Sequence, residues 1–441
     1  MAEASADGRP FVWKNRDGGE PTGSRRHFLG YVTGRSYRYL GVHPSDADPR
    51  MGVNEKGLAF GNCTAQAFKR SQQYDYANTQ ALKQYILGET SSVEEARRAI
   101  LANTLGSADD WPTSVALMPG IFDATGKVVL WEIGDEEVYE YDPEAPARRA
   151  QLRWPIYARD NTVHARTDHT DDLGYTGTRY TIPRDLLLAA AERGGVTVED
   201  FIRAARAGEP GVDGNRVPSR DRTTATMIAH GVLSGEDPRI VTMWNALGQP
   251  DYAVFVPVWV AVGDSLSPRA SSNDLGESLS GASERLWLKN DGDGYDVYVN
   301  GLLEPMEANF LEAVRMARER WLRSGFEPDE ARRIHREASE TAWHTLSSLA
   351  AGSGRSLNAT PRLTELTADT SGLRVAFAAR AVDPDGPIAS HHWSFGDGAT
   401  SAQPRPVHTY ASPGTYLVRV RVSDAGGSRN SRWRYVDVAG E

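Results

Sequence analysis

Apolar and polar positions divide the chain into three stretches of different periodicity. From Phe11 to about Gly263, short β-rich runs alternate with segments whose apolar residues recur at helical spacing. The β-rich runs are FVWKN, VNEKGLAFGN, GKVVLWEI and YAVFVPVWVAV, and the helical segments are Asn78–Gly88, Val93–Leu105 and Pro183–Arg193. Thr197 precedes a further capped helix, VEDFIRAARAG. This alternation predicts one mixed domain of helices and strands over residues 1–263.

The middle stretch, residues 264–352, begins with a segment poor in apolar periodicity. Residues 264–303 are rich in Ser, Gly, Asn and Asp, which predicts a loop or flap over the core. Within it, DGDGYD at 291–296 spaces carboxylates like part of a calcium loop but lacks the full pattern, so a solvated turn is preferred. Two amphipathic helices follow at 305–324 and 328–351, and we expect them to pack on the main domain.

The last stretch, residues 362–441, follows a predicted linker at 353–361 and contains only short alternating strands. LRVAFAARAVD, SHHWSFGDG and GTYLVRVRVSD are separated by turns rich in Gly, Pro and Asp. This spacing predicts a small all-β sandwich of the immunoglobulin-like kind.

Composition narrows the class of protein. A chain of 441 residues with 40% hydrophobic residues exceeds what one core usually serves, so two or more domains are expected. No run approaches the roughly 18 apolar residues of a membrane helix. The formal net charge of -10 argues against nucleic acid as a partner, and the single cysteine, Cys63, excludes an intrachain disulfide or a multi-thiolate metal site. The N-terminus has no signal-segment pattern.

The C-terminal stretch resembles a PKD domain, on AVDPDGPIASHHWSFGDG followed by HTYASPGTYLVRVRVSD. We expect Trp393 to anchor the core, Gly396 and Gly398 to permit a tight turn around Asp397, and Tyr410 to hold the strand pairing. The resemblance implies a secreted or cell-surface protein that contacts proteins or polysaccharides through this domain.

Three carboxylates of the PKD-like stretch, Asp383, Asp385 and Asp397, could bind a cation. Turn-forming carboxylates are the preferred interpretation.

The stretch from about residue 4 to 263 resembles a second family. WKNRD at 13–17, GVNEKGLAFGN at 52–62, YARDN at 157–161 and EDPRIVTMWNALGQP at 236–250 occur in order. These motifs are similar to those of the penicillin V acylase, choloylglycine hydrolase and acyl-coenzyme A:isopenicillin N acyltransferase group. This group belongs to the N-terminal nucleophile (Ntn) hydrolases. Within it, the motifs are most similar to those of the bacterial linear amide hydrolases, which include carcinine hydrolases.

The Ntn resemblance implies an α+β fold, a four-layer αββα sandwich, and hydrolysis of a linear amide through an acyl-enzyme. In the family the nucleophile is a mature N-terminal cysteine whose own α-amine is the general base. Carried over by motif, Asp17 holds the amine, and Asn62 and Asn161 supply donors to the oxyanion or substrate carbonyl. Those residues are expected to converge on one pocket.

The resemblance also assigns roles to basic residues near the nucleophile. Arg16 or Lys14 would add positive charge beside the thiol. Arg222 or Arg220 would match a strand-borne arginine of the family, and the sequence leaves that choice open. The substrate would be a small acyl amide, and no cofactor or metal is expected.

The family's cysteine would fall a few positions before Met1. A late gene start, a cut chain or a natural pseudoenzyme would each account for this, and truncation is the favoured interpretation. Ser5 is a formal but poor substitute, because it lies close to Asp17 in the chain and is not terminal.

Cys63 directly follows Asn62 on a predicted strand, so the two side chains should point to opposite faces. We therefore expect an inert core thiol, although Cys63 with His164 or His169 would make a rival nucleophile and base. Two functions stay open: a linear amide hydrolase, or a catalytically inactive binding protein that adheres through its pocket and PKD domain. The coding sequence upstream of codon 1 would separate them.

Overall fold

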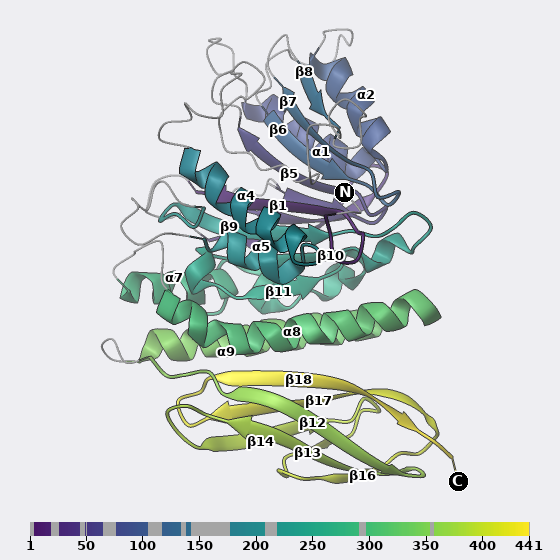
Figure 1. The fold of residues 1–441 in the computed structure, drawn as a ribbon, viewed down its shortest axis with the longest axis vertical. Helices are drawn as coiled ribbons and strands as arrows, with labels where there is room; N and C mark the ends of the chain where they lie inside the picture. The colour runs from purple at the N-terminus through teal and green to yellow at the C-terminus, as the bar shows by residue number, and fades with distance from the viewer. Residues whose placement is uncertain are drawn as a thin grey trace. The chain divides into compact units, whose positions relative to one another are not determined.

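The computed structural model describes residues 4–18, 26–44, 49, 51–64, 76–104, 117–133, 138–142, 177–207, 218–290, 297–352 and 357–440. The chain forms two compact units (Figure 1). The first comprises residues 1–250 and 258–264, and the second comprises 251–257, 265–292 and 296–441.

A seven-stranded antiparallel sheet forms one part of the first unit, and its strands follow chain order. They are β2 (Phe28–Thr33), β3 (Arg38–His43), β4 (Met51–Asn54), β5 (Ala59–Thr64), β6 (Leu117–Phe122), β7 (Val128–Ile133) and β8 (Val138–Tyr141). Helices α1 (Tyr76–Glu89) and α2 (Val93–Thr104) contact this sheet, α1 at β3, β4 and β5 and α2 at β7. Phe60 and Trp131 of the sheet share a buried cluster with Ile86 of α1 and Ile100 of α2.

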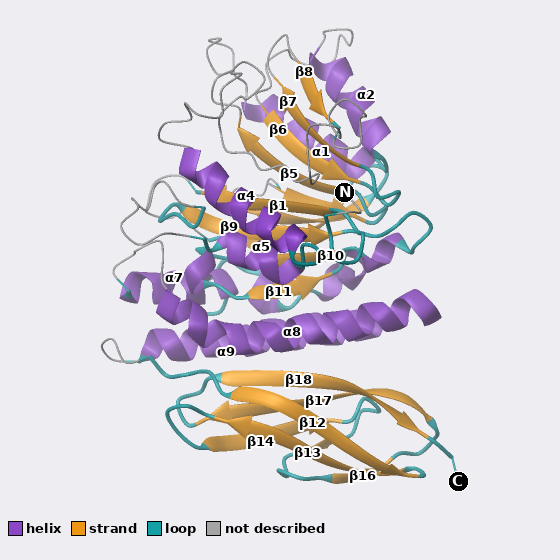
Figure 2. Cartoon of the chain, viewed as in Figure 1, coloured by secondary structure: helices purple, strands orange, loops and turns teal. Residues whose placement is uncertain are grey.

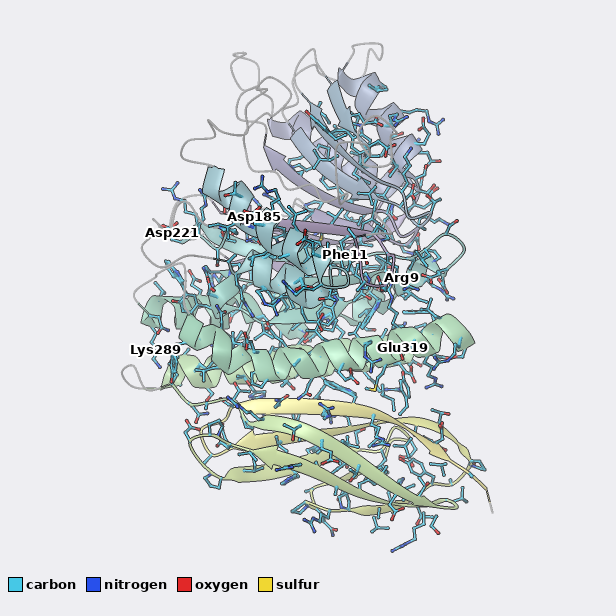
Figure 3. All side chains as sticks on the ribbon, in the orientation of Figure 1. Arg9, Phe11, Asp185, Asp221, Lys289 and Glu319 are labelled. Atoms are coloured by element: carbon cyan, nitrogen blue, oxygen red, sulfur yellow. The ribbon has the colours of Figure 1, made fainter. Side chains whose placement is uncertain are left out.

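A second antiparallel sheet of this unit contains β1 (Phe11–Asp17), β9 (Thr223–His230) and β10 (Thr242–Ala246), with β9 paired to both others. Helix α5 (Val198–Ala205) packs on β9, and α4 (Gly177–Glu192) packs on α5. Phe11 of β1, labelled in Figure 3, stacks on His230 with ring centroids 4.3 Å apart. It also contacts Phe201 of α5 at 4.8 Å.

The two sheets of the first unit face each other. β1 contacts β5 and β6, and β4 contacts β9. Gly61 of β5 makes this approach possible, because a Cβ there would lie 3.0 Å from Val12 and 3.4 Å from Lys14 on β1. Helices therefore lie outside two facing antiparallel sheets (Figure 2), and the predicted mixture of helices and strands is confirmed.

A local capping signal sets the start of α5 in the first unit. The Thr197 hydroxyl accepts the Asp200 N–H, and the Asp200 carboxylate accepts the Thr197 N–H, a reciprocal capping box that begins α5 as predicted. The helix predicted from Pro183 instead begins at Gly177, so proline lies inside α4. Three short 3-10 helices are η4 (Pro238–Ile240), η5 (Pro250–Tyr252) and η6 (Val260–Ser265).

The second unit contains β11 (Phe255–Val258) and four helices, α6 (Pro268–Ser271), α7 (Leu279–Lys289), α8 (Val297–Ser324) and α9 (Pro328–Ala351). The prediction of a loop over 264–303 was wrong for α6 and α7, and the DGDGYD run lies outside the described residues. Ser278 caps α7 by accepting the Gly281 N–H, a signal obscured by the surrounding Ser and Gly. The bounds predicted for α9 are confirmed.

Helix α8 was predicted to begin at Pro305 but begins at Val297 and runs through the proline. Val299, Leu303, Met306 and Phe310 are buried at helical spacing on both sides of Pro305. Burial of this continuous apolar stripe offsets the backbone hydrogen bond that proline removes.

Residues 362–438 form the predicted β-sandwich, of sheets β12-β13-β16 and β15-β14-β17-β18. The strands are β12 (Arg362–Ser371), β13 (Arg374–Val382), β14 (Ile388–Ser394), β15 (Thr400–Ser401), β16 (Val407–Thr409), β17 (Gly414–Asp424) and β18 (Arg429–Val438). Trp393 is fully buried in the core, as expected. Gly396 and Gly398 adopt φ of 89° and 98°, which the turn around Asp397 requires.

Helices α8 and α9 contact β18 within this unit. Polar side chains join the two layers: the Ser431 hydroxyl donates to Glu337 of α9 at 2.8 Å, and Asn309 of α8 donates to Asn430 at 2.9 Å. The helices thus have a packing surface on the sandwich. Their predicted packing on the N-terminal domain stays a prediction.

Candidate active site

Asp17 lies at the end of β1, where the ladder with β9 shifts register between Arg16 and Asp17. Its carboxylate forms an ion pair with the Arg220 guanidinium, and the Thr223 hydroxyl lies 3.1 Å from Oδ1. The Asp17 side chain is 20% exposed and that of Arg220 is 12% exposed, so the pair is largely withdrawn from water but still accessible. A carboxylate held this way can accept further hydrogen bonds from an ammonium group.

Asn15, two residues before Asp17, fixes β1 in place through side-chain hydrogen bonds. Its amide nitrogen donates to the carbonyls of Ala205 and Pro218 at 2.9 and 3.0 Å. Its oxygen accepts from the Trp13 indole at 2.9 Å and the Thr226 hydroxyl at 2.8 Å. All four hydrogen-bonding positions are therefore used, and β1 is tied to α5 and to the segment that leads into Arg220.

Thr223 joins the Asn15 contacts to Asp17. Its hydroxyl lies 3.3 Å from the Pro218 carbonyl and accepts the Arg220 N–H at 3.2 Å. Sequence reasoning assigned no role to Asn15 or Thr223. The available signal was spacing: Trp13, Asn15 and Asp17 alternate along one strand, which places a polar pair beside an aromatic residue.

The two candidate arginines differ in their contacts. Arg220 contacts Asp17, whereas Arg222 is exposed and contributes its carbonyl to the Gly18 N–H at 2.8 Å. Arg220 is therefore the arginine that contacts Asp17, and its role in a catalytic site stays a prediction.

Lys14 and Arg16 occupy the other face of β1. A Cβ at Gly61 would lie 3.4 Å from the Lys14 Cβ, so Lys14 faces β5. Arg16 has the same parity along the strand as Lys14, opposite to that of Asn15. Lys14 and Arg16 therefore lie on the face of β1 opposite to Asn15.

Asn62 is a buried residue of β5, directly after Gly61. Because Gly61 faces β1 and Phe60 packs with α1 and α2, alternation turns Asn62 toward the helix-covered face. Asn161 lies outside the described residues. The convergence of Asp17, Asn62 and Asn161 on one pocket stays a prediction.

The alternative nucleophiles are placed differently. Ser5 pairs with Val196 and donates to Asp7 at 2.8 Å, at the end of β1 opposite to Asp17. The strand between them spans about 20 Å at ~3.3 Å per residue, so Ser5 does not reach Asp17. The Cys63 side chain, His164 and His169 lie outside what the structure describes.

Two of the three predicted cation candidates of the sandwich, Asp385 and Asp397, accept backbone N–H groups. Asp397 accepts the Ala399 N–H at 3.0 Å and contacts His408 at 2.6 Å, and Asp385 accepts the Ala359 N–H at 2.8 Å. Across the described ranges, no group of three His, Cys, Asp or Glu side chains is arranged to hold a metal ion. No described helix is long and apolar enough to cross a membrane.

Comparison with known proteins identifies the C-terminal stretch: residues 358–438 match the PKD domain family. A microbial collagenase from Vibrio alginolyticus is 49% identical over 47 residues, 11% of this chain and 6% of that protein. Collagenase ColA from Bacillus cereus is 39% identical over 54 residues, 12% of this chain and 6% of the collagenase. The chain spans about 6% of the length of these curated relatives.

Solved structures similar to the chain fall into two groups. The PKD1 domain of Vibrio anguillarum Epp aligns over 19% of this chain and 99% of its own, with 31% identity and TM-score 0.19. A mutant conjugated bile acid hydrolase from Clostridium perfringens aligns over 55% of this chain and 87% of its own, with 16% identity and TM-score 0.33. Penicillin V acylase from Agrobacterium tumefaciens aligns over 57% of this chain and 82% of its own, with 14% identity and TM-score 0.35.

The family match confirms the predicted PKD resemblance. Residues 358–438 are a PKD domain, and a further part of the chain resembles the bile acid hydrolase and penicillin V acylase structures.

Proposed function

We propose that the first unit is an Ntn-hydrolase sandwich of four layers that hydrolyses linear amide C–N bonds of small acyl amides. The observation that carries the proposal is the Asp17 carboxylate, held by Arg220 and Thr223 at the end of β1. It is a fixed anion with access to water, which suits a group that must hold an ammonium.

In this proposal the nucleophile is a cysteine that becomes N-terminal by processing, and its α-amine takes the thiol proton. Asp17 orients the amine, and Lys14 and Arg16 add positive charge near the thiolate. In the described part of the chain β1 is the last strand of its sheet, so one edge has room for a strand bearing that cysteine. The cysteine within the 441 residues is Cys63.

The reaction would proceed in two steps. The thiolate attacks the amide carbonyl, the C–N bond breaks as the amine leaves with a proton, and water then hydrolyses the thioester. Asn161 is the proposed donor to the oxyanion, because alternation places Asn62 on the helix-covered face of β5. The PKD domain is proposed to act outside the cell, by contact with a protein or polysaccharide.

The test compares the 441-residue chain with a longer chain that includes the segment encoded upstream. Amine release is measured across amides of varied acyl groups. We expect hydrolysis by the longer chain, its loss when the N-terminal cysteine is replaced by alanine, and near inertness of the 441-residue chain. Hydrolysis by the 441-residue chain that disappears in Cys63→Ala would place the nucleophile at Cys63 instead.

The second candidate function is a binding protein without catalysis. The PKD domain favours it, because that domain supplies contact rather than chemistry. A stop codon directly upstream of codon 1, or inertness of the longer chain on every amide tested, would support this candidate over the hydrolase.

A further inference from the structure

Three arginines and two histidines of the second unit lie on one surface formed by α9, β14, β17 and β18, with Arg269 beside α9. This surface, named here the arginine surface, comprises Arg269, His344, His392, Arg421 and Arg429. The side chains of Arg269, His344 and Arg421 are 19%, 30% and 21% exposed, so they are partly withdrawn from water and still reachable.

Strand register brings three of these side chains together. His392 on β14 is the direct partner of Arg421 on β17. Arg429 on β18 is the partner of Ser423, two residues along from Arg421. Direct and diagonal partners on one sheet face are neighbours, so His392, Arg421 and Arg429 form a row. The two arginines of this row are the cations, since burial and Arg421 lower the pKa of His392.

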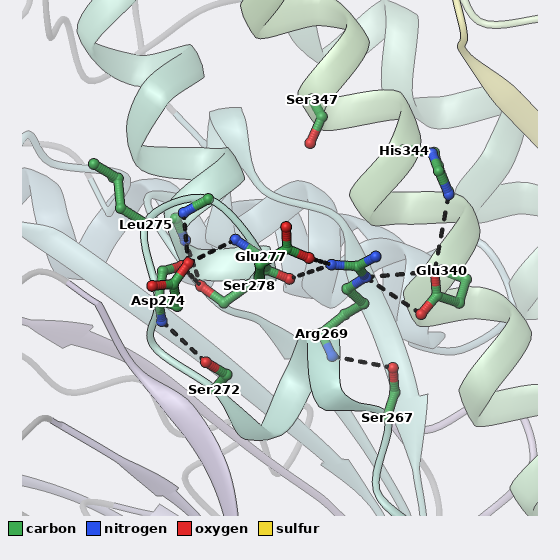
Figure 4. A network of polar contacts seen from close by, with 12 residues as sticks. Ser267, Arg269, Ser272, Asp274, Leu275, Glu277, Ser278, Glu340, His344 and Ser347 are labelled. Carbon is green, nitrogen blue, oxygen red and sulfur yellow. Dashed lines mark hydrogen bonds and ion pairs between the residues drawn. The ribbon is translucent and has the colours of Figure 1, made fainter.

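Helix α9 adds the other side of the surface. The Thr345 hydroxyl donates to the Arg429 carbonyl and accepts the Arg429 N–H, both at 2.9 Å, which fixes the Arg429 backbone against α9. The Arg429 charge acts on His344. Figure 4 shows Arg269 and His344 approaching Glu340, with nitrogen–oxygen distances of 3.3 and 3.9 Å. The Arg269 guanidinium also stacks 3.6 Å over the Trp343 ring, which fixes its plane.

The carboxylates on this surface are already occupied. Glu337 pairs with Arg419 and accepts the Ser431 hydroxyl at 2.8 Å, and Arg421 approaches it only at 3.4 Å. Glu340 faces Arg269 and His344 together. Arg269 also pairs with Glu277, so four arginines of this region, Arg269, Arg419, Arg421 and Arg429, face three carboxylates, Glu277, Glu337 and Glu340.

The pKa values of two side chains on this surface are lowered by neighbouring arginines. Burial, followed by the charges of Arg429, Arg269 and Arg421, lowers the pKa of His344 to about 4. Burial also lowers the pKa of Arg429, with Arg421 acting in the same direction. An anion placed among these groups would relieve their repulsion.

We propose that the arginine surface binds a tetrahedral oxyanion, phosphate or sulfate, either free or as an ester on a polysaccharide. Guanidinium groups match such oxygens bidentately, and Arg421 and Arg429 offer two of them on adjacent strands. The site goes beyond the proposed amide hydrolysis and needs no residue of the first unit.

Titration calorimetry of the 441-residue chain with sodium sulfate, at low ionic strength, tests the proposal. We expect saturable binding whose Kd rises about fivefold in Arg421→Gln and in Arg429→Gln, since each removes a charge-assisted contact of partly exposed groups. Arg315→Gln is the matched control: it removes the same charge, but Arg315 pairs with Glu312 and Glu319 on α8.

An equal rise of the sulfate Kd in Arg315→Gln would mean that only the net charge of the protein matters, and it would overturn the proposal. Absence of saturable sulfate binding would overturn it as well. Arg429→Lys keeps the charge and should recover part of the affinity, which guards against a variant that merely misfolds. Dextran sulfate, with uncharged dextran as control, separates the two sources. Tighter binding of dextran sulfate per sulfate group favours the ester, and equal binding favours the free ion.

Discussion

Replacing Arg220 by glutamine removes the guanidinium that pairs with Asp17 and leaves a largely buried carboxylate. Exposed ion pairs contribute about 0–1 kcal/mol, and breaking a buried pair costs about 3–5 kcal/mol. With side chains 12% and 20% exposed, this pair lies between those limits, so we expect a loss of about 2 kcal/mol in the free energy of unfolding. For a unit of this size that corresponds to a melting temperature lower by about 4–8 °C.

The matched control is Arg222→Gln. It removes the same charge from an exposed side chain that lies two positions after Arg220. Differential scanning calorimetry should show a change below about 0.5 kcal/mol for this variant. In the longer chain, Arg220→Gln should also lower kcat, because Asp17 would lose its fixed position. Equal melting temperatures for the two variants would refute the assignment of Arg220 to the site.

Three further predictions concern the PKD domain. Trp393→Ala should cost about 3–5 kcal/mol, because the ring is fully buried, and urea unfolding of the second unit checks it. Burial opposes ionisation of Asp397, but hydrogen bonds from His408 and the Ala399 N–H lower its pKa overall. Its stabilisation is therefore present above the unfolded pKa near ~3.9 and lost as pH falls below it, and Asp397→Asn should abolish that acid dependence in melting curves. Burial and Asp385 raise the pKa of Asp383 to about 6. Ionisation of Asp383 therefore destabilises the fold as pH rises from about 4 to 6. Asp383→Asn should raise the melting temperature at pH 7.5 and leave it unchanged at pH 4.

Features with strong local signals could be predicted from the sequence. Helix α9 has its predicted bounds because proline marks its start and its apolar stripe is regular. The turn at Asp397 was predictable because only glycine readily adopts the positive φ of Gly396 and Gly398.

Features set by tertiary contacts could not be predicted. Helix α8 passes through Pro305 because its buried stripe continues on both sides of the proline. Arg220 and Arg222 have the same local chemistry, and only pairing of β1 with β9 brings Arg220 to Asp17. The contributions of Asn15 and Thr223 likewise depend on contacts between distant segments.

Intact-mass spectrometry of the longer chain, quenched during turnover of an acyl amide, tests the proposed chemistry most directly. The account predicts a mass increase equal to the acyl group, located by peptide mapping on the N-terminal cysteine. It also predicts that Asp17→Asn lowers the rate at which this adduct forms. Amide hydrolysis with the acyl group found on Cys63, or with no thioester at any time point, would contradict the account.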